Sequence, residues 1–295
     1  MNKIRLSFVQ KLLLVGVYEI LFIVIAMVLL KRVGAFGCFD DCFNYGAGYF
    51  LLQGKELYNG IFFNHQPFMA FISAGIQYIS HPQTLFELIK YHRITSLLFA
   101  NLFGIFLIFR FGFPLFLSLV IFESTKFYVF GDRFLAEGVI VYPMMYLALL
   151  IWNRSIGKKI YVYEYIVMAI CSWFIYWMRE PFIPWSVLVV VAFFAVGYKD
   201  KNQRKNVIHG VLALATLHVI TFLHLPIREY VFNVIQANMI HEVSMQSWTV
   251  LTISQTIMYP LFILLPRELA GQTVALSRPA IHIRLWQFYR RDDHT

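Results

Sequence analysis

The chain has 295 residues, of which 59% are hydrophobic and 14% are charged, and its mean hydropathy is +0.65. A soluble domain of this length could not bury so much apolar surface, so the composition indicates a protein that crosses a membrane several times. The net charge of +9 would suit nucleic acid. Basic loops are the ordinary topology signal of membrane proteins, however, and we expect membrane lipids rather than nucleic acid as partners.

Nine apolar runs follow one another along the chain. They cover 12–30, 66–80, 94–109, 113–130, 134–152, 160–178, 182–198, 207–225 and 249–266. The first run resembles a signal sequence, but it is long enough to span a bilayer and no small-residue cleavage pattern follows it, so we predict an uncleaved helix. The run 66–80 would be only about 22 Å long as a helix, against a hydrocarbon core of roughly 30 Å, and is predicted to lie at the interface.

The distribution of basic residues sets the topology. With 66–80 on the outer surface and the N-terminus in the cytoplasm, the cytoplasmic segments hold 16 of the 25 Lys and Arg residues, as the positive-inside rule requires. The sequence therefore predicts an all-α, polytopic helix bundle in the cell membrane. It has about eight transmembrane helices, a first outer loop over 31–93 that contains the interfacial helix, and both termini in the cytoplasm.

Two regions differ in character. Residues 1–266 are predicted to form the transmembrane domain, whereas 267–295 read as a basic cytoplasmic tail. Because this tail becomes polar directly after the last apolar run, we hypothesise a truncated or frame-shifted end. An inactive, truncated membrane protein is therefore one alternative for the function of the chain.

Charged residues inside the predicted spans need partners, because a lone charge facing lipid is costly. Glu123 and Lys126 are three positions apart on one predicted helix, so they can pair across a turn and face the bundle. For Glu19 and Glu164 two alternatives stay open: the two acids face each other's helices, or they are protonated.

Acidic residues gather on the predicted outer side. Nine of the 16 acids lie there. The three most suggestive clusters are Asp40-Asp41, 131–137 with Asp132 and Glu137, and Arg179-Glu180. Acids that converge on one membrane face suggest a site. The alternative is that outer loops, which need few cations, simply tolerate acids.

The first outer loop carries a family resemblance. Its motif consists of Asp40-Asp41, Tyr45, Gly46, Leu51-Leu52, Gly54-Lys55, Leu57-Tyr58 and Asn64-His65-Gln66-Pro67. In this order and spacing the segment resembles the first outer loop of the GT-C membrane glycosyltransferases, in particular the protein O-mannosyltransferase and aminoarabinose-transferase-like group. Glu137 matches a second acid of that family, and Arg179-Glu180-Pro181 matches its R-x-P motif. The resemblance covers roughly residues 1 to 200.

The resemblance implies a transferase that takes a hexosyl or pentosyl group from a polyprenyl-phosphate donor. The sugar would pass, with inversion, to a glycan, lipid or protein acceptor outside the cytoplasm. Asp40 would be the general base on the acceptor hydroxyl, supported by Asp41 and assisted by Glu137. The lipid-phosphate leaving group needs cations or hydrogen-bond donors, and the substrate-binding candidates are Lys55, Tyr58, His65, Arg133 and Arg179.

Each of these assignments has a competing explanation. Asp40 and Asp41 would also suit a solvated loop or the N-cap of a helix, and adjacent carboxylates can hold a divalent metal, although the sequence fixes no cofactor. Glu137 would suit a helix N-terminus, and Arg179 would suit the end of a span. At the level of function, the alternative class is a transporter or flippase of lipid-linked saccharides, which should place its charges near the membrane midplane.

Overall fold

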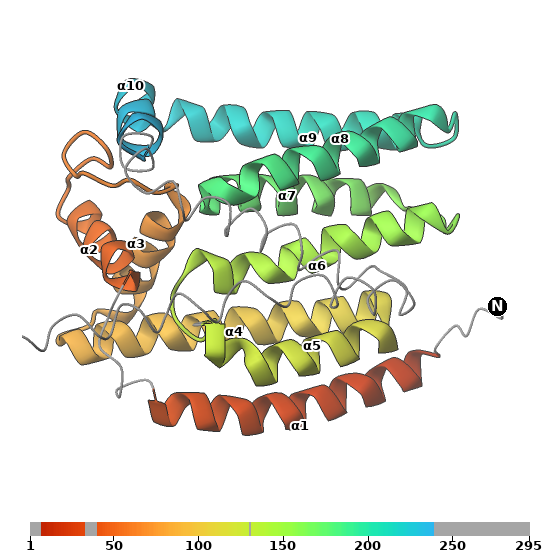
Figure 1. The fold of residues 1–295 in the computed structure, drawn as a ribbon, viewed down its shortest axis with the longest axis horizontal. Helices are drawn as coiled ribbons and strands as arrows, with labels where there is room; N and C mark the ends of the chain where they lie inside the picture. The colour runs from red at the N-terminus through yellow and green to blue at the C-terminus, as the bar shows by residue number, and fades with distance from the viewer. Residues whose placement is uncertain (1–6, 33–39, 130, 239–295) are drawn as a thin grey trace, which may run out of the picture. The chain divides into compact units, whose positions relative to one another are not determined.

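The computed structural model describes residues 7–32, 40–129 and 131–238, which form an all-α bundle (Figure 1). The ten α-helices of the described residues are α1 (Phe8–Arg32), α2 (Asp41–Leu52), α3 (Phe68–Ser80), α4 (Leu85–Phe111), α5 (Phe113–Thr125), α6 (Ala136–Ser155), α7 (Val162–Met178), α8 (Ile183–Lys199), α9 (Arg204–Leu223) and α10 (Ile227–Tyr230). Three short helical turns accompany them: η1 (Lys126–Val129), η2 (Glu180–Phe182) and the π-helix η3 (Val231–Gln236).

The first eight apolar runs each become a helix, as the hydropathy pattern predicts. The largest difference is at α4, which begins at Leu85, well before the run at 94–109. The reason is an N-cap: the Thr84 hydroxyl accepts a hydrogen bond from the Glu87 backbone N–H at 3.2 Å, which satisfies a donor of the first turn. The run 249–266 and the tail 267–295 lie outside the described residues.

In the described part of the chain, four helices are long and apolar enough to cross a membrane. These are α1, α4, α6 and α9, and they indicate a multi-pass membrane protein. Helices α7 and α8 have 17 residues each, about 25 Å at roughly 1.5 Å per residue, which is the lower limit for a span. Helix α5 has 13 residues and is shorter still. The count of eight spans stays a prediction.

The long helices run back and forth between two ends of the bundle. Helices α2, α3 and α10 lie together at one end, which we call the α2/α3 end, and α1 begins at the opposite end (Figure 1). The α5–α6 and α7–α8 connections lie at the α2/α3 end, whereas the α6–α7 and α8–α9 connections lie at the opposite end (Figure 1). The segments predicted to face outward are therefore grouped at one end, as the predicted topology requires.

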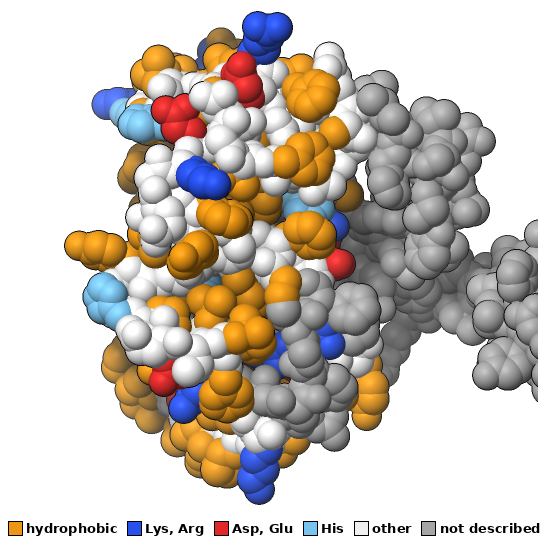
Figure 2. Space-filling view, turned by 90° about the vertical axis from the view of Figure 1, so that its left-hand side faces the viewer, with side chains coloured by type: hydrophobic (Ala, Val, Ile, Leu, Met, Phe, Trp, Pro, Cys, Tyr) orange, Lys and Arg blue, Asp and Glu red, His pale blue; other side chains and the backbone are white. Residues whose placement is uncertain are grey.

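Helix α3 is the predicted interfacial helix, and it packs closely against α2. A side chain at Gly48 of α2 would place its Cβ 2.5 Å from the Ser73 hydroxyl of α3, so only glycine allows this approach. The opposite face of α3 exposes Tyr78 and Ile79. Figure 2 looks at this end and shows hydrophobic side chains spread between separate charged ones, which suits contact with a membrane interface.

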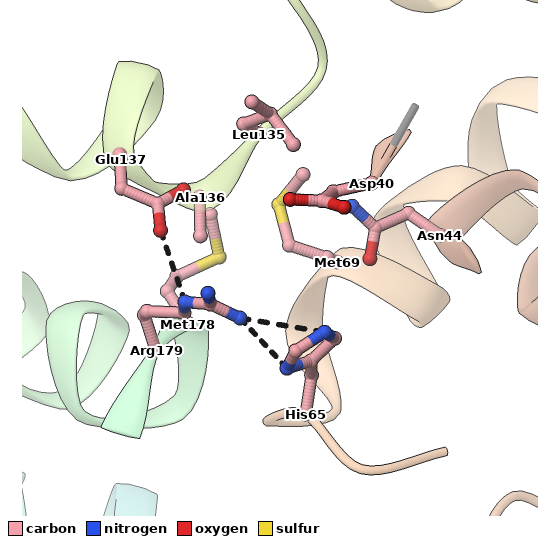
Figure 3. Close-up of a pocket in the computed structure, with 9 residues that line it drawn as sticks. All are labelled: Asp40, Asn44, His65, Met69, Leu135, Ala136, Glu137, Met178 and Arg179. Carbon is pink, nitrogen blue, oxygen red and sulfur yellow. Dashed lines mark hydrogen bonds and ion pairs between the residues drawn. The ribbon is translucent and has the colours of Figure 1, made fainter. Parts of the chain in front are cut away.

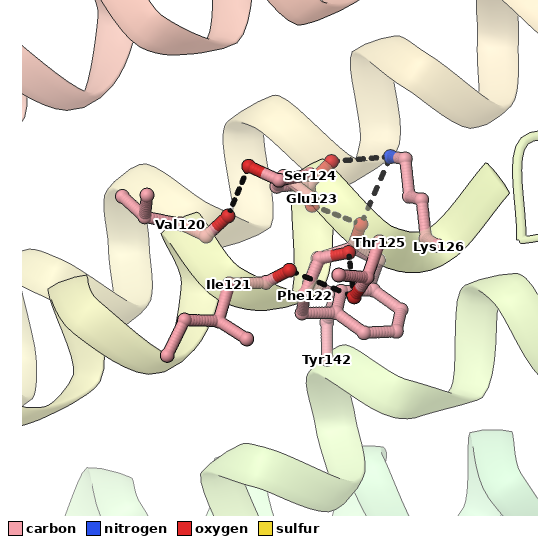
Figure 4. A network of polar contacts seen from close by, with 8 residues as sticks. All are labelled: Val120, Ile121, Phe122, Glu123, Ser124, Thr125, Lys126 and Tyr142. Atoms are coloured by element: carbon pink, nitrogen blue, oxygen red, sulfur yellow. Dashed lines mark hydrogen bonds and ion pairs between the residues drawn. The ribbon is translucent and has the colours of Figure 1, made fainter. Parts of the chain in front are cut away.

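A buried polar network joins α5, η1 and α6 (Figure 4). Lys126 and Glu123 form an ion pair with almost no solvent exposure, and the Tyr142 hydroxyl donates to Glu123 Oε1 at 2.5 Å. The pairing across one turn is thus confirmed. The two charges compensate each other inside the bundle, which avoids the cost of an isolated charge in a low-dielectric interior.

The other two acids within predicted spans also have partners. The Glu164 carboxylate accepts from Arg110 Nε at 2.6 Å and from the Tyr161 backbone N–H at 2.8 Å, so it both pairs with α4 and caps α7. Glu19 of α1 accepts from the Asn101 side chain of α4 at 3.0 Å. Both acids therefore contact α4, and these contacts are not the predicted ones, in which each acid faces the helix of the other.

Removing the cation from the buried pair should destabilise the bundle. The substitution Lys126→Met leaves Glu123 buried without its counter-ion, which we expect to cost about 3–5 kcal/mol and to lower the unfolding temperature in detergent. The double variant with Glu123→Leu removes both charges and should recover most of that loss. Lys90→Met, at an exposed lysine, is the control. Equal losses in the single and double variants would refute the pairing.

Candidate active site

A cavity of about 200 Å³ opens at the α2/α3 end. Nine residues line it: Asp40 and Asn44 at the start of α2, His65 and Met69 around the start of α3, Leu135, Ala136 and Glu137 at the start of α6, and Met178 and Arg179 at the end of α7 (Figure 3). Three helices thus begin at the cavity. Their N-terminal backbone N–H groups carry partial positive charge, so the cavity favours an anionic group.

Arg179 bridges two walls of the cavity (Figure 3). Its Nη1 donates to His65 Nδ1 at 2.7 Å, and its Nε forms an ion pair with Glu137 Oε1 at 3.0 Å. Burial and the nearby Arg179 charge lower the pKa of His65 to about 4, so the imidazole is neutral and accepts the hydrogen bond at neutral pH. The Glu137 side chain is 47% exposed, and an ion pair with that much solvent around it is weak enough to exchange.

Asp40 lies at the other side of the cavity, across from Glu137 and Arg179 (Figure 3). It occupies the N-cap position of α2, yet its side chain makes no capping hydrogen bond. The capping explanation for this acid is therefore not supported. The residue is exposed, so an incoming hydroxyl group can reach the carboxylate.

Asp41 has a different environment from its neighbour. Its carboxylate is fully buried, 3.5 Å from Arg93 Nη2 of α4, and accepts a hydrogen bond from the Tyr45 hydroxyl at 2.9 Å. Asp41 does not line the cavity but fastens α2 to α4, and its predicted role as the support of Asp40 stays a prediction. Asp40 lines the cavity whereas Asp41 faces the interior, so the two carboxylates do not converge on one site for a metal ion. Among the residues that the structure describes, no three His, Cys, Asp or Glu side chains form a group that could hold a metal ion.

A second layer of polar contacts supports the start of α2. The ring of Tyr45 packs on His92 with centroids 4.4 Å apart, and His92 Nε2 lies 2.8 Å from the Ser73 hydroxyl. Gln77 donates to the Tyr45 carbonyl at 2.9 Å, and Asn44 donates to the Phe134 carbonyl at 3.2 Å. These contacts fix α2 against α3, α4 and the segment before α6. The partners in these contacts are far apart in the sequence, so no sequence motif indicates the contacts.

The loop that carries His65 is held by the segment after α9. The Tyr58 hydroxyl donates to the His65 carbonyl at 2.8 Å, and Asn233 donates to the Tyr58 carbonyl at 3.2 Å. Tyr58 has a φ of +70°, a conformation that bulky residues rarely adopt, and it is buried. Tyr58 therefore shapes the loop and does not line the cavity, and its contact with substrate stays a prediction.

Two further predicted binding residues lie outside the cavity lining. Lys55 is exposed, with its Nζ 4.7 Å from the centroid of the Phe50 ring, and Arg133 is buried just before α6. Glu180, which follows Arg179, belongs to the predicted outer acids but not to the predicted site residues. Its Oε1 is buried without a hydrogen-bond partner, and burial raises its pKa. Of the eight predicted site residues, Asp40, His65, Glu137 and Arg179 line the cavity.

Low pH should lower the stability of the α2/α3 end because of His65. Its pKa is about 4 in the folded chain against roughly 6.5 when unfolded. Between these values the unfolded chain binds the extra proton, so stability falls as pH drops from about 6.5 to 4. We expect His65→Gln, which keeps an acceptor for Arg179, to show a smaller fall in unfolding temperature between pH 7.5 and 4.5 than the wild type. His209→Gln, at an exposed histidine, should behave as wild type, and identical falls in all three proteins would exclude His65 as the source.

Comparison with known proteins finds no family model, no curated protein and no solved structure that matches this chain. The functional case therefore rests on the motif and on the geometry of the cavity.

Proposed function

We propose that the chain is a membrane glycosyltransferase of the GT-C type. It transfers a sugar from a polyprenyl-phosphate donor to an acceptor hydroxyl at the outer face of the membrane. One observation carries the proposal: Asp40, His65, Glu137 and Arg179, which the motif selects from four separate stretches of sequence, line a single cavity at the α2/α3 end. That end combines an accessible base, a cation and three helix N-termini.

Asp40 acts as the general base. Its carboxylate takes the proton of the acceptor hydroxyl while the oxygen attacks C1 of the sugar from the face opposite the phosphate. The new bond between C1 and the acceptor oxygen forms as the bond between C1 and the phosphate oxygen breaks, and the phosphate leaves with the electron pair. A single displacement of this kind inverts the anomeric carbon. The absence of a capping hydrogen bond on Asp40 leaves its oxygens available for this proton.

Arg179 stabilises the charge on the leaving phosphate. The guanidinium has two partners in the cavity, the neutral His65 and the half-exposed Glu137. A phosphate can displace Glu137 from Arg179 because that ion pair is largely solvated, whereas the His65 contact keeps the guanidinium in place. The N-termini of α2, α3 and α6 add partial positive charge on the same side of the reaction.

The setting of the cavity suits a lipid-linked donor. Hydrophobic side chains of α2 and α3, among them Phe43, Tyr49, Phe71, Tyr78 and Ile79, are exposed at this end. Such side chains favour the boundary between headgroups and acyl chains. A donor whose phosphate lies at that boundary reaches the cavity by lateral diffusion, while its polyprenyl chain stays in the bilayer.

Loss of the Asp40 carboxylate should abolish most of the activity. In proteoliposomes with a polyprenyl-phosphate donor that is radiolabelled in its sugar, and with membrane extract as the acceptor, Asp40→Asn should lower transfer by about 10²–10⁴-fold. Glu56→Gln, at an exposed acid outside the cavity, is the matched control. Full transfer by Asp40→Asn would refute the assignment. If the wild type moves the intact donor across the vesicle membrane without cleaving it, the flippase alternative holds, and if it does neither, the chain is an inactive membrane protein.

The role of Arg179 predicts a graded series. Arg179→Lys keeps a cation but loses the planar fork that contacts two partners, and Arg179→Gln removes the charge. We expect the transfer rate to fall in the order wild type, Lys and Gln, with the Gln variant about 10²–10³-fold below wild type. Arg228→Gln at the same end, in α10 and outside the cavity, controls for a general change of surface charge. Equal activity of the Gln and Lys variants would argue against a phosphate-binding role.

A further inference from the structure

We infer, on the basis of the proposed glycosyl transfer, that Asn44 recognises the 2-hydroxyl of the transferred sugar. The donor is then a sugar with a free hydroxyl next to its anomeric carbon, and not a 2-deoxy or 2-acetamido sugar. Asn44 lines the cavity, but neither the motif of the first outer loop nor the proposed displacement gives it a role. Its position beside the base and the state of its amide group both suit recognition of a hydroxyl.

Asn44 lies one helical turn after Asp40 on the same face of α2. Asp40 already has helical backbone angles, with φ of −60° and ψ of −25°, so the two residues have the i, i+4 spacing of a helix. Side chains with this spacing are neighbours, with about 5–6 Å between their Cβ atoms. Both line the cavity (Figure 3). When C1 of a sugar lies beside Asp40, the next position of the ring is therefore within reach of Asn44.

The Asn44 amide is held in one orientation and has hydrogen-bonding capacity to spare. Its Nδ2 donates to the Phe134 carbonyl at 3.2 Å, and because a carbonyl only accepts, this contact distinguishes the amide nitrogen from the oxygen. The residue is only 5% exposed, so packing restricts the side chain further. No described residue is a hydrogen-bond partner of the second N–H or of Oδ1. A hydroxyl group both donates and accepts, and it can therefore satisfy either of them.

The rest of the lining sets how a sugar lies in the cavity. An in-line displacement at C1 needs the acceptor oxygen on the Asp40 side and the phosphate on the Arg179 side, and these two residues face each other across the cavity (Figure 3). Met69 and Met178 supply apolar surface on which the C–H groups of a sugar ring can pack. The volume of about 200 Å³ is below the roughly 300–1,000 Å³ of pockets for drug-sized ligands. It suits a single sugar ring, whose 2-hydroxyl then meets Asn44.

The test measures donor binding in the absence of acceptor, so that no transfer occurs. The purified full chain in nanodiscs is titrated with polyprenyl phosphates that carry glucose, mannose or 2-deoxyglucose, three sugars that differ only at C2, and with sugar-free polyprenyl phosphate. The wild type should bind at least one of the two donors with a 2-hydroxyl about tenfold more tightly than the 2-deoxy donor, as one hydrogen bond contributes. Asn44→Ala should remove this difference among the three donors.

Two further variants separate recognition from folding. Asn59→Ala, at an exposed asparagine of the same end that lies outside the cavity, is the matched control and should keep the difference. Asn44→Gln retains an amide for the Phe134 carbonyl but displaces its oxygen by one methylene group, so it should reduce the difference even though that contact is kept.

Equal binding of all three donors by the wild type, a comparison that needs no variant, would overturn the inference. So would a loss of affinity in Asn44→Ala that is as large for sugar-free polyprenyl phosphate as for the sugar-bearing donors, because the residue would then only hold α2 in place. If the wild type shows the preference at C2 but transfers no sugar to any acceptor, Asn44 keeps its assignment and the transferase proposal fails.

Discussion

The contact between Arg179 and its two partners is the interaction on which the α2/α3 end depends. It joins the end of α7, the start of α6 and the loop before α3, three segments that are distant in sequence. His65 is neutral, and the exposed Glu137 forms an ion pair with Arg179. The guanidinium is therefore fixed in position yet remains available to an anion. This combination suits a group that must receive a phosphate without moving.

Asp40 and Asp41 are adjacent at the start of α2, but they have different environments. Successive residues at a helix start point about 100° apart, so Asp41 turns toward Arg93 and Tyr45 in the interior while Asp40 lines the cavity. The buried pair anchors the helix on which the exposed acid stands. Without Arg93, the buried Asp41 carboxylate would lose this cation, a change that costs several kcal/mol, and the first turn of α2 would lose one of the contacts that hold it beside the cavity.

Local patterns in the sequence predicted the helices and part of the site, and tertiary contacts decided the rest. Apolar runs located α1 and α3 to α9, because helix burial in a membrane needs only local hydrophobicity. The motif indicated His65, Glu137 and Arg179 by order and spacing. It named Asp40 as the base and Asp41 as its support, but it did not show that Asp41 is buried against α4. It also gave no sign of the contact between Tyr58 and Asn233, whose partners are 175 positions apart. Such partners follow from packing and leave no periodic signal.

A membrane bundle has few places for charge, and this constraint acts along the whole length of the bundle. Charges between the ends are compensated within the protein, as Glu123 is by Lys126 and Glu164 is by Arg110. Glu19, in the middle of α1, has the neutral Asn101 as its partner, and charges at the ends of the helices are solvated by water and headgroups. The positive-inside rule predicts that the basic connections at the opposite end face the cytoplasm. In that predicted topology, the long helices that connect both ends would turn the cavity with Asp40 and Arg179 toward the outer face.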